Sequence, residues 1–198
     1  MLTREQNDLL THVEGNAPMG RLMREHYWIP AALSSQIVED GTPLRVRLLG
    51  EDFVAFRATD GTVGFLNERC PHRGTSLALA RNEGCGLRCI FHGWKIDVSG
   101  KVVDVPTHSP NPEAFAAKVP VGHYQTHEGG GIIWVRLGAQ EAPPFPQLPF
   151  TVMPASQVWL TITKCYGLDH RDVVPVNVLK PAETGDPGQI IDYYASAK

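Results

Sequence analysis

The chain has 198 residues, 42% of them apolar, and a formal net charge of −3. This size allows one or two domains with a buried core, and the near balance of charge indicates neither nucleic acid nor an anionic membrane as a partner. No apolar run approaches the roughly 20 residues that cross a bilayer, and acidic residues occupy the place of a secretory apolar segment, so we expect a cytoplasmic protein without membrane or nucleic-acid partners.

Residues 1–28 are predicted to form an N-terminal helical segment. Thr3 and Gln6 match a capping box at its start. Apolar residues then recur at helical spacing, at Leu9, Leu10 and Val13. Residues that interrupt a helix follow at Gly15, Pro18 and Gly20. The segment is therefore expected to contain two short helices instead of one long helix over 3–27.

From residue 29 the pattern changes to that of strands. Apolar and arginine residues alternate over 44–49, a turn is predicted at 50–52, and Asp60-Gly61 separates two further strands in a hairpin. The hairpin strands and the later candidate strands are 53–58, 62–67, 86–90, 94–98, 101–105, 132–137 and 158–165. The proline-rich stretches that predict irregular chain are 106–127 and 143–154. Short strands joined by Gly-rich turns predict a mainly β fold, an antiparallel sandwich or barrel.

Two short loops each combine a cysteine with a histidine. The first reads Cys70-Pro-His72-Arg-Gly and the second reads Cys89-Ile-Phe-His92-Gly-Trp. A Rieske [2Fe–2S] cluster takes two cysteines on one iron and two histidines on the other. Structural zinc also uses Cys₂His₂ sets, but its sequences usually pair Cys with Cys and His with His. We therefore predict a Rieske cluster bound by Cys70, His72, Cys89 and His92, with structural zinc as an alternative.

The remaining reactive side chains are expected to have other roles. Cys85 breaks the ligand spacing and is expected, like Cys165, to be a reduced thiol. Arg73 and Arg88 flank the loops, where they would either meet carboxylates of a partner or form ion pairs within the domain. Trp94 is expected to shield the cluster loop from water. Residues expected to lie at the surface or at strand ends without a site role are His108, His123, His127, Glu68 and Asp104.

Residues 1–165 resemble the N-terminal part of Rieske non-haem iron oxygenase α subunits, and they look most like the phthalate dioxygenase group. The stretches that carry the resemblance are Gly41–Phe56, Glu68–Ser76 and Arg88–Pro106 with its Phe-His-Gly-Trp core. The resemblance implies a Rieske-type (ISP-like) antiparallel β sandwich over residues 29–138. It further implies a linker and the first strand of a catalytic-type domain over residues 139–165.

The resemblance also implies an oxidoreductase function in aromatic compound catabolism. In such oxygenases a flavin and iron–sulfur reductase that uses NAD(P)H feeds electrons to the Rieske cluster. The cluster passes them to a mononuclear Fe(II), which activates O₂ for ring hydroxylation, and the subunits assemble in rings. Respiratory Rieske proteins carry a disulfide between their loops and a serine after the second His-Gly. Thr75, Phe91 and Trp94 stand at the matching positions here, which implies a potential at the low end of the Rieske range.

Residues 166–198 depart from the family pattern. The family's mononuclear iron is held by two histidines and a carboxylate, marked by an Asp-x-x-His-x₄₋₅-His helix after the strand that here ends at Cys165. This chain offers Asp169, His170 and Asp172 with no later histidine, so we expect no metal there and identify no catalytic residue. The C-terminal region is expected to be partial and truncated, a proline-rich tail without regular structure, and the chain alone is expected not to hydroxylate. A stand-alone Rieske ferredoxin-type electron carrier is the alternative.

Overall fold

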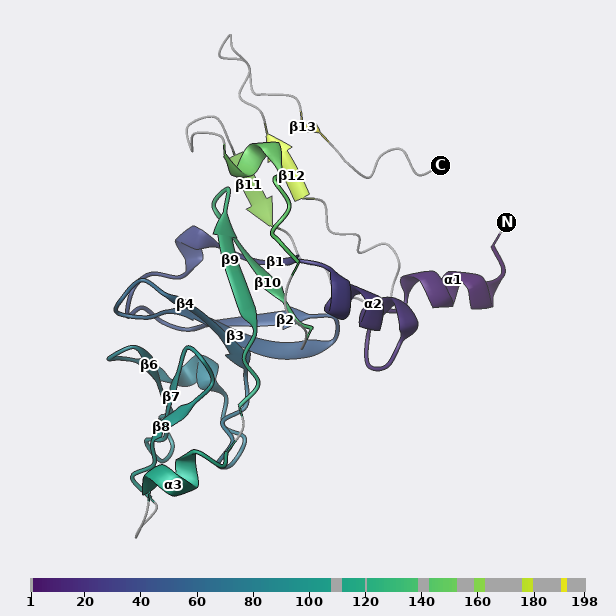
Figure 1. Ribbon diagram of the computed structural model, residues 1–198. Coiled ribbons are helices and arrows are strands. Elements are labelled where there is room, and N and C mark those ends of the chain that lie inside the picture. The colour runs from purple at the N-terminus through teal and green to yellow at the C-terminus, as the bar shows by residue number, and fades with distance from the viewer. Residues whose placement is uncertain are drawn as a thin grey trace.

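The computed structural model describes residues 2–107, 112–119, 121–138 and 143–152, together with the backbone of three further strands (Figure 1). Its α-helices are α1 (Arg4–Thr11), α2 (Pro18–His26) and α3 (Pro112–Ala116), and its 3₁₀ turns are η1 (Ser34–Gln36), η2 (Leu77–Leu79) and η3 (Pro149–Thr151). Its strands are β1 (Ile29–Leu33), β2 (Leu44–Leu48), β3 (Glu51–Arg57), β4 (Val63–Asn67), β5 (Arg81–Asn82), β6 (Gly86–Arg88), β7 (Lys95–Asp97), β8 (Val102–Asp104), β9 (Gln125–Gly129), β10 (Ile132–Arg136), β11 (Trp159–Ile162), β12 (Val176–Leu179) and β13 (Ile190–Ile191).

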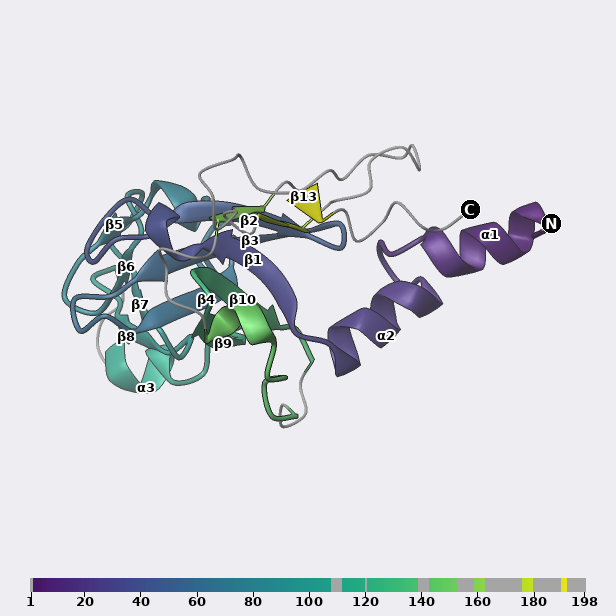
Figure 2. The same ribbon diagram turned by 90° about the horizontal axis from the view of Figure 1, so that it is seen from above.

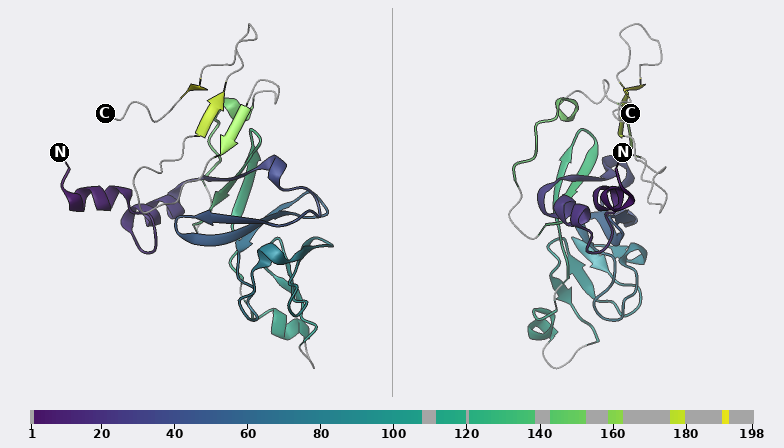
Figure 3. Two further views of the ribbon diagram at one scale, coloured as in Figure 1. Left: turned by 180° about the vertical axis from the view of Figure 1, so that it is seen from behind. Right: turned by 90° about the vertical axis from the view of Figure 1, so that its right-hand side faces the viewer.

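The strands form four small sheets with the orders β2-β3-β4, β1-β10-β9, β5-β6-β7-β8 and β11-β12-β13. The strand pairings within these sheets are antiparallel. The predicted mainly β, antiparallel architecture with N-terminal helices is therefore confirmed. In the turned views, β5 to β8 and α3 lie at one end of the molecule and α1 lies at the other (Figures 2 and 3). Among the described helices, none has the length and apolar character needed to cross a membrane.

Strand β3 supplies side chains to two separate hydrophobic cores. Successive residues of a strand point to opposite faces of its sheet. Val54 and Phe56 are buried in a core shared with β6, β7 and β8, where Leu87 and Ile96 also lie. The intervening residue Ala55 is buried on the other face, in a core shared with β1 and β10. The β2-β3-β4 sheet is thus the middle layer of the domain, between the sheet that carries the cysteine and histidine loops and the sheet that follows the N-terminal helices.

The N-terminal segment contains the two helices that the sequence predicts. The Thr3 hydroxyl accepts the Gln6 N–H at 3.2 Å and the Gln6 side chain accepts the Thr3 N–H at 2.9 Å, so the capping box is present. Helix α1 ends at Thr11, and Pro18 begins α2 because the first helical position needs no N–H donor. Gly20 lies inside α2, and it is buried where a Cβ would meet the carbonyl of Val13.

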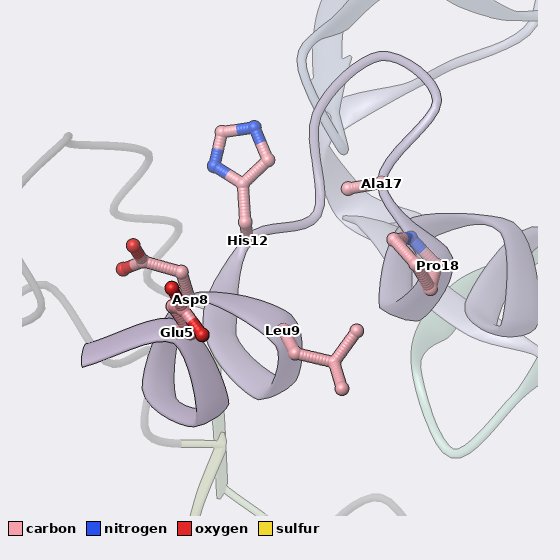
Figure 4. A pocket seen from close by; sticks show the side chains of 6 residues that line it. All are labelled: Glu5, Asp8, Leu9, His12, Ala17 and Pro18. Carbon is pink, nitrogen blue, oxygen red and sulfur yellow. The ribbon is translucent and has the colours of Figure 1, made fainter. Parts of the chain in front are cut away.

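A hollow lies between α1 and the start of α2 (Figure 4). Its lining residues are Glu5, Asp8, Leu9, His12, Ala17 and Pro18. No residue of α1 is buried. Helices α1 and α2, which carry these residues, lie at the end of the molecule away from β6 and β7 (Figure 2), so the hollow is separate from the cysteine and histidine site.

Three expectations about secondary structure differ from the structure. The turn after β2 contains only Leu49 and Gly50, which both have positive φ (48° and 83°), so residues 51 and 52 belong to β3. Residues 106–127 are not wholly irregular, because they include α3 and the start of β9. The tail contains β12, which pairs with β11, and β13, which pairs with β12. Residues 163–175, which include Cys165, Asp169, His170 and Asp172, lie outside the described residues.

Candidate metal centre

The first ligand loop connects β4 to β5 and is closed by two backbone hydrogen bonds. The Cys70 N–H donates to the Thr75 carbonyl and the Gly74 N–H donates to the Cys70 carbonyl, both at 2.9 Å. Gly74 has a φ of 71°, a conformation that residues with a Cβ rarely adopt. The exposed Arg69 side chain donates to the Gly74 carbonyl at 3.2 Å. This loop is therefore a closed turn with its cysteine at the start and its histidine at the tip.

The second ligand loop connects β6 to β7 and repeats this pattern. The Cys89 N–H donates to the Trp94 carbonyl at 2.8 Å, and the Gly93 N–H donates to the Cys89 carbonyl at 3.0 Å. Gly93 has a φ of 72°. The Arg88 side chain donates to the Gly93 carbonyl at 2.7 Å. Each loop thus begins with an Arg-Cys pair, and the arginine binds the carbonyl of the glycine that ends the turn.

The two loops bring the four predicted ligands together as two pairs. The thiols of Cys70 and Cys89 are 3% exposed each, and the two side chains interact directly. The imidazole rings of His72 and His92 are edge to face, with centroids 4.5 Å apart. Nδ1 of His72 is buried without a hydrogen-bond partner. Two buried thiols, two adjacent imidazoles and a ring nitrogen left open are the donors that a cluster with Cys₂ and His₂ ligation requires.

Electrostatics at the site disfavour the charged forms of Cys70 and His72. Burial raises the pKa of the Cys70 thiol to about 11, against the opposing effect of N–H groups of His72 and Arg73, and the nearby Cys89 thiol raises it further. Burial, followed by the charges of His92 and Arg73, lowers the pKa of His72. A neutral imidazole is the form that binds metal, whereas each thiol must first lose its proton.

Trp94 covers the first histidine although it belongs to the second loop. Its indole ring stacks on His72 with centroids 4.6 Å apart and an interplanar angle of 4°. The indole is 4% exposed, and its N–H donates to the Thr107 hydroxyl at 2.8 Å. The expected role of Trp94 as a cover over a ligand loop agrees with this placement. Sequence reasoning did not find Thr107, which follows β8 and carries no motif of its own.

The structure assigns supporting roles to two acids that the sequence analysis treats as ordinary. Glu68 is 2% exposed, and its carboxylate accepts the Ser76 hydroxyl across the first loop. Arg45 lies 3.3 Å from the other carboxylate oxygen, an ion-pair distance without hydrogen-bond geometry. Asp104 accepts from Arg88 at 2.8 Å. Nothing in the local sequence of Glu68 indicates its burial, although its place two residues before Cys70 puts it beside the loop.

Arg88 is committed to groups within the domain, which decides between its two expected roles. Glu83 and Asp104 both form ion pairs with it, and its side chain is 20% exposed. The hydrogen bond to Asp104, then the one to Glu83, raise the pKa of the guanidinium. Arg73 is exposed. The only feature in the sequence that could have indicated the Arg69 and Arg88 contacts is the repeated Arg-Cys pair.

The other cysteine and histidine residues considered as possible ligands lie outside the paired loops or outside the described residues. Cys85 is half-buried on the turn between β5 and β6, with a φ of 62°. His123 and His127 are exposed, as predicted for surface residues. The ring of His127 stacks on Phe145 with centroids 4.0 Å apart. His108 lies outside the described residues.

Comparisons with known proteins agree with this site. The family model for the Rieske [2Fe-2S] domain matches residues 27–125. The chain is 48% identical over 165 residues to the phthalate 4,5-dioxygenase oxygenase subunit of Pseudomonas putida, covering 83% of this chain and 37% of that protein. It is 45% identical over 158 residues to the 3-chlorobenzoate-3,4-dioxygenase oxygenase subunit of Comamonas testosteroni, covering 79% of this chain and 36% of that protein.

A solved structure shows the same kinship at the level of the fold. The oxygenase and ferredoxin complex of carbazole 1,9a-dioxygenase matches with a TM-score of 0.58 and 25% identity, over 73% of this chain and 37% of the matched chain. The chain therefore spans well under half the length of the relatives that it matches. By its fold, its paired loops and these matches, the chain belongs to the Rieske [2Fe–2S] domain family, and its similarity is to part of the oxygenase subunits of phthalate-type oxidoreductases.

Proposed function

We propose that Cys70, His72, Cys89 and His92 hold a [2Fe–2S] cluster at the tips of the two loops. The observation that carries the proposal is the convergence of a buried thiol pair and an imidazole pair on loops with the same backbone hydrogen bonds. When bound, such a cluster supplies one-electron transfer.

The surrounding residues prepare the ligands for binding. Because burial raises the pKa of Cys70, loading the site releases thiol protons. N–H groups of His72 and Arg73 point at the Cys70 sulfur and favour its thiolate form. The indole of Trp94 keeps water from one face of His72. These residues thus bind, orient and shield, and none of them is assigned a step in bond cleavage.

We further propose that the chain is the electron-relay portion of a phthalate-type aromatic-ring oxygenase. Electrons would come from a flavin and iron–sulfur reductase that uses NAD(P)H, in the cytoplasm, and would leave toward a mononuclear iron whose ligands we do not assign to this chain. The similarity to part of the phthalate-type subunits supports this division of labour. The chain would then consist of a helical segment (residues 1–28), the Rieske domain (29–138), a linker with one strand (139–165) and the tail (166–198). A homo-oligomer is proposed on the same kinship.

The proposed cluster has a potential in the lower part of the Rieske range. The position after the second His-Gly is Trp94, whose only hydrogen-bond donor outside the backbone is spent on Thr107. A donor to the cluster sulfur is one of the factors that raise Rieske potentials. Voltammetry of the loaded protein is expected to give a midpoint below zero, and a midpoint well above zero would contradict this part of the proposal.

Spectroscopy of the loaded chain tests the ligand set. The loaded protein is expected to contain two irons and two sulfides per chain, and after reduction it should give a rhombic EPR signal. Cys70→Ser and Cys89→Ser should each abolish this signal, whereas Cys85→Ser, at the half-buried thiol outside the loops, should keep it. A colourless protein that holds one zinc would overturn the proposal. Turnover of an aromatic acid by this chain with reductase and O₂ would overturn the proposal that the chain serves as the electron relay alone.

A further inference from the structure

One residue joins the two ligand loops. The carbonyl of Trp94 accepts the Cys89 N–H and closes the second loop at 2.8 Å. The side chain of the same residue crosses to the first loop and stacks on His72, with an interplanar angle of 4°. The position of the His72 ring therefore depends on a residue whose backbone is fixed by the other loop.

The indole is held from the side opposite the loops as well. Its N–H donates to Oγ1 of Thr107 at 2.8 Å, and the ring of Phe115 in α3 meets it edge to face with centroids 5.7 Å apart. A buried indole N–H needs an acceptor, because an unpaired polar group in such a place is costly. With Trp94 at 4% exposure, the Thr107 hydroxyl fixes which way the ring plane lies.

His72, by contrast, has little else to fix its ring. Nδ1 of His72 is buried without a hydrogen-bond partner in the protein, so before a cluster binds there no bond from the protein sets the rotation of the imidazole at that atom. Its remaining ring contact is edge to face with His92. The parallel stack on Trp94 is thus the contact that best defines the plane in which Nδ1 lies.

We propose that Trp94 and Thr107 form a positioning pair that orients His72 and thereby tunes the reduction potential of the cluster. This inference rests on the proposed function, in which His72 is a ligand. Loss of the pair would let the ring tilt and admit water. Reduction adds negative charge, which water stabilises, and the apolar shell around a site controls its potential. A disturbed pair should therefore shift the potential in the positive direction.

The test compares four variants of the full, cluster-loaded chain by voltammetry and EPR. Thr107→Val keeps the shape of the side chain and removes the acceptor, so it should shift the midpoint positively and change the g values. Thr107→Ser keeps the hydroxyl and should retain the wild-type values. Trp94→Phe removes the N–H from the other end of the same bond and should shift the midpoint in the same direction. Trp28→Phe removes an indole bond to the Pro143 carbonyl, away from the loops, and should change neither quantity.

The outcomes separate this inference from the proposed function. If Thr107→Val retains the full cluster with the wild-type midpoint and g values, the positioning role is wrong. If Thr107→Val does not hold a cluster, Trp94→Phe decides the question by the same two measurements. A wild-type chain that lacks the rhombic signal would contradict the proposed function itself, before any variant is measured.

Discussion

The two ligand loops have the same backbone and different support. Both are closed by two hydrogen bonds around a cysteine and a left-handed glycine. Arg69 of the first loop is exposed, whereas Arg88 of the second is held by two carboxylates. The first loop is instead held by the buried carboxylate of Glu68, which accepts the hydroxyl of Ser76. The spacing of cysteine and glycine therefore sets the shape of a loop, and side chains outside this turn set how firmly it is held.

The largest expected contrast between the loops comes from the two arginines. Arg88→Met removes the bond to the Gly93 carbonyl and takes the nearest cation away from Glu83 and Asp104, so it should lower the free energy of unfolding by about 2–3 kcal/mol. Arg69→Met removes one exposed bond and should cost about 0.5–1.5 kcal/mol. Urea denaturation followed by far-UV circular dichroism measures both. Equal effects would show that the carboxylates do not strengthen the second loop.

The anchor of the first loop gives the next effect. Ser76→Ala removes the hydroxyl that donates to the buried Glu68 carboxylate, and loss of a donor to a buried charged group should cost about 1.5–3 kcal/mol. The control is Ser99→Ala, which removes an exposed hydroxyl bond to Asp97 and should change stability by less than about 0.5 kcal/mol. The same urea titration applies. A Ser76→Ala variant as stable as this control would mean that Glu68 does not anchor the loop.

The glycines test whether the two backbones are equivalent. Gly74 and Gly93 have φ values of 71° and 72°, and a Cβ at either position would meet nothing closer than 3.4 Å. Alanine at each position should therefore cost only the left-handed strain, about 1–2 kcal/mol. The two losses in thermal or urea stability should agree closely. A much larger loss at one position would reveal a constraint that the shared hydrogen-bond pattern does not contain.

The smallest effect concerns the pH dependence of the ion pair between Glu83 and Arg88. The hydrogen bond from Arg88 is the main cause that lowers the pKa of Glu83 from its ordinary 4.5. A carboxyl with a lowered folded pKa contributes stability that is present above its unfolded pKa and is lost as the pH falls through its folded pKa. The stability difference between the wild type and Glu83→Gln should thus be full at neutral pH and shrink below pH 4.5. A difference that does not change over this range would contradict the coupling to Arg88.

The sequence predicts much of the framework because its signals are local. The capping box of Thr3, the hairpin at Asp60-Gly61 and the cysteine and histidine spacing all act within a few residues. Strand β9 is missed because its sequence, Gln-Thr-His-Glu-Gly, is polar and mostly exposed, so pairing with the apolar β10 decides its structure. The turn at Leu49-Gly50 is predicted too long, since a non-glycine residue occupies its first left-handed position.

The site itself is predictable only as far as its ligand motifs. The four ligand residues, Cys70, His72, Cys89 and His92, stand out by residue type and spacing, and the fold brings them together as a thiol pair and an imidazole pair. The residues that hold them do not stand out. Thr107 and Glu68 act through contacts made by tertiary packing, and neither the burial of a carboxylate nor the direction of an indole N–H is visible in a linear pattern.

Strand β3 contributes to both hydrophobic cores, so we expect the domain to fold as one cooperative unit. Because its alternate residues enter different cores, a slip of one residue would exchange both sets of side chains at once. Because β3 is held by both cores, the slowest amide hydrogen exchange should lie along this strand. The sheet next to the N-terminal helices and the sheet that carries the ligand loops should then unfold together, in the same concentration range of denaturant.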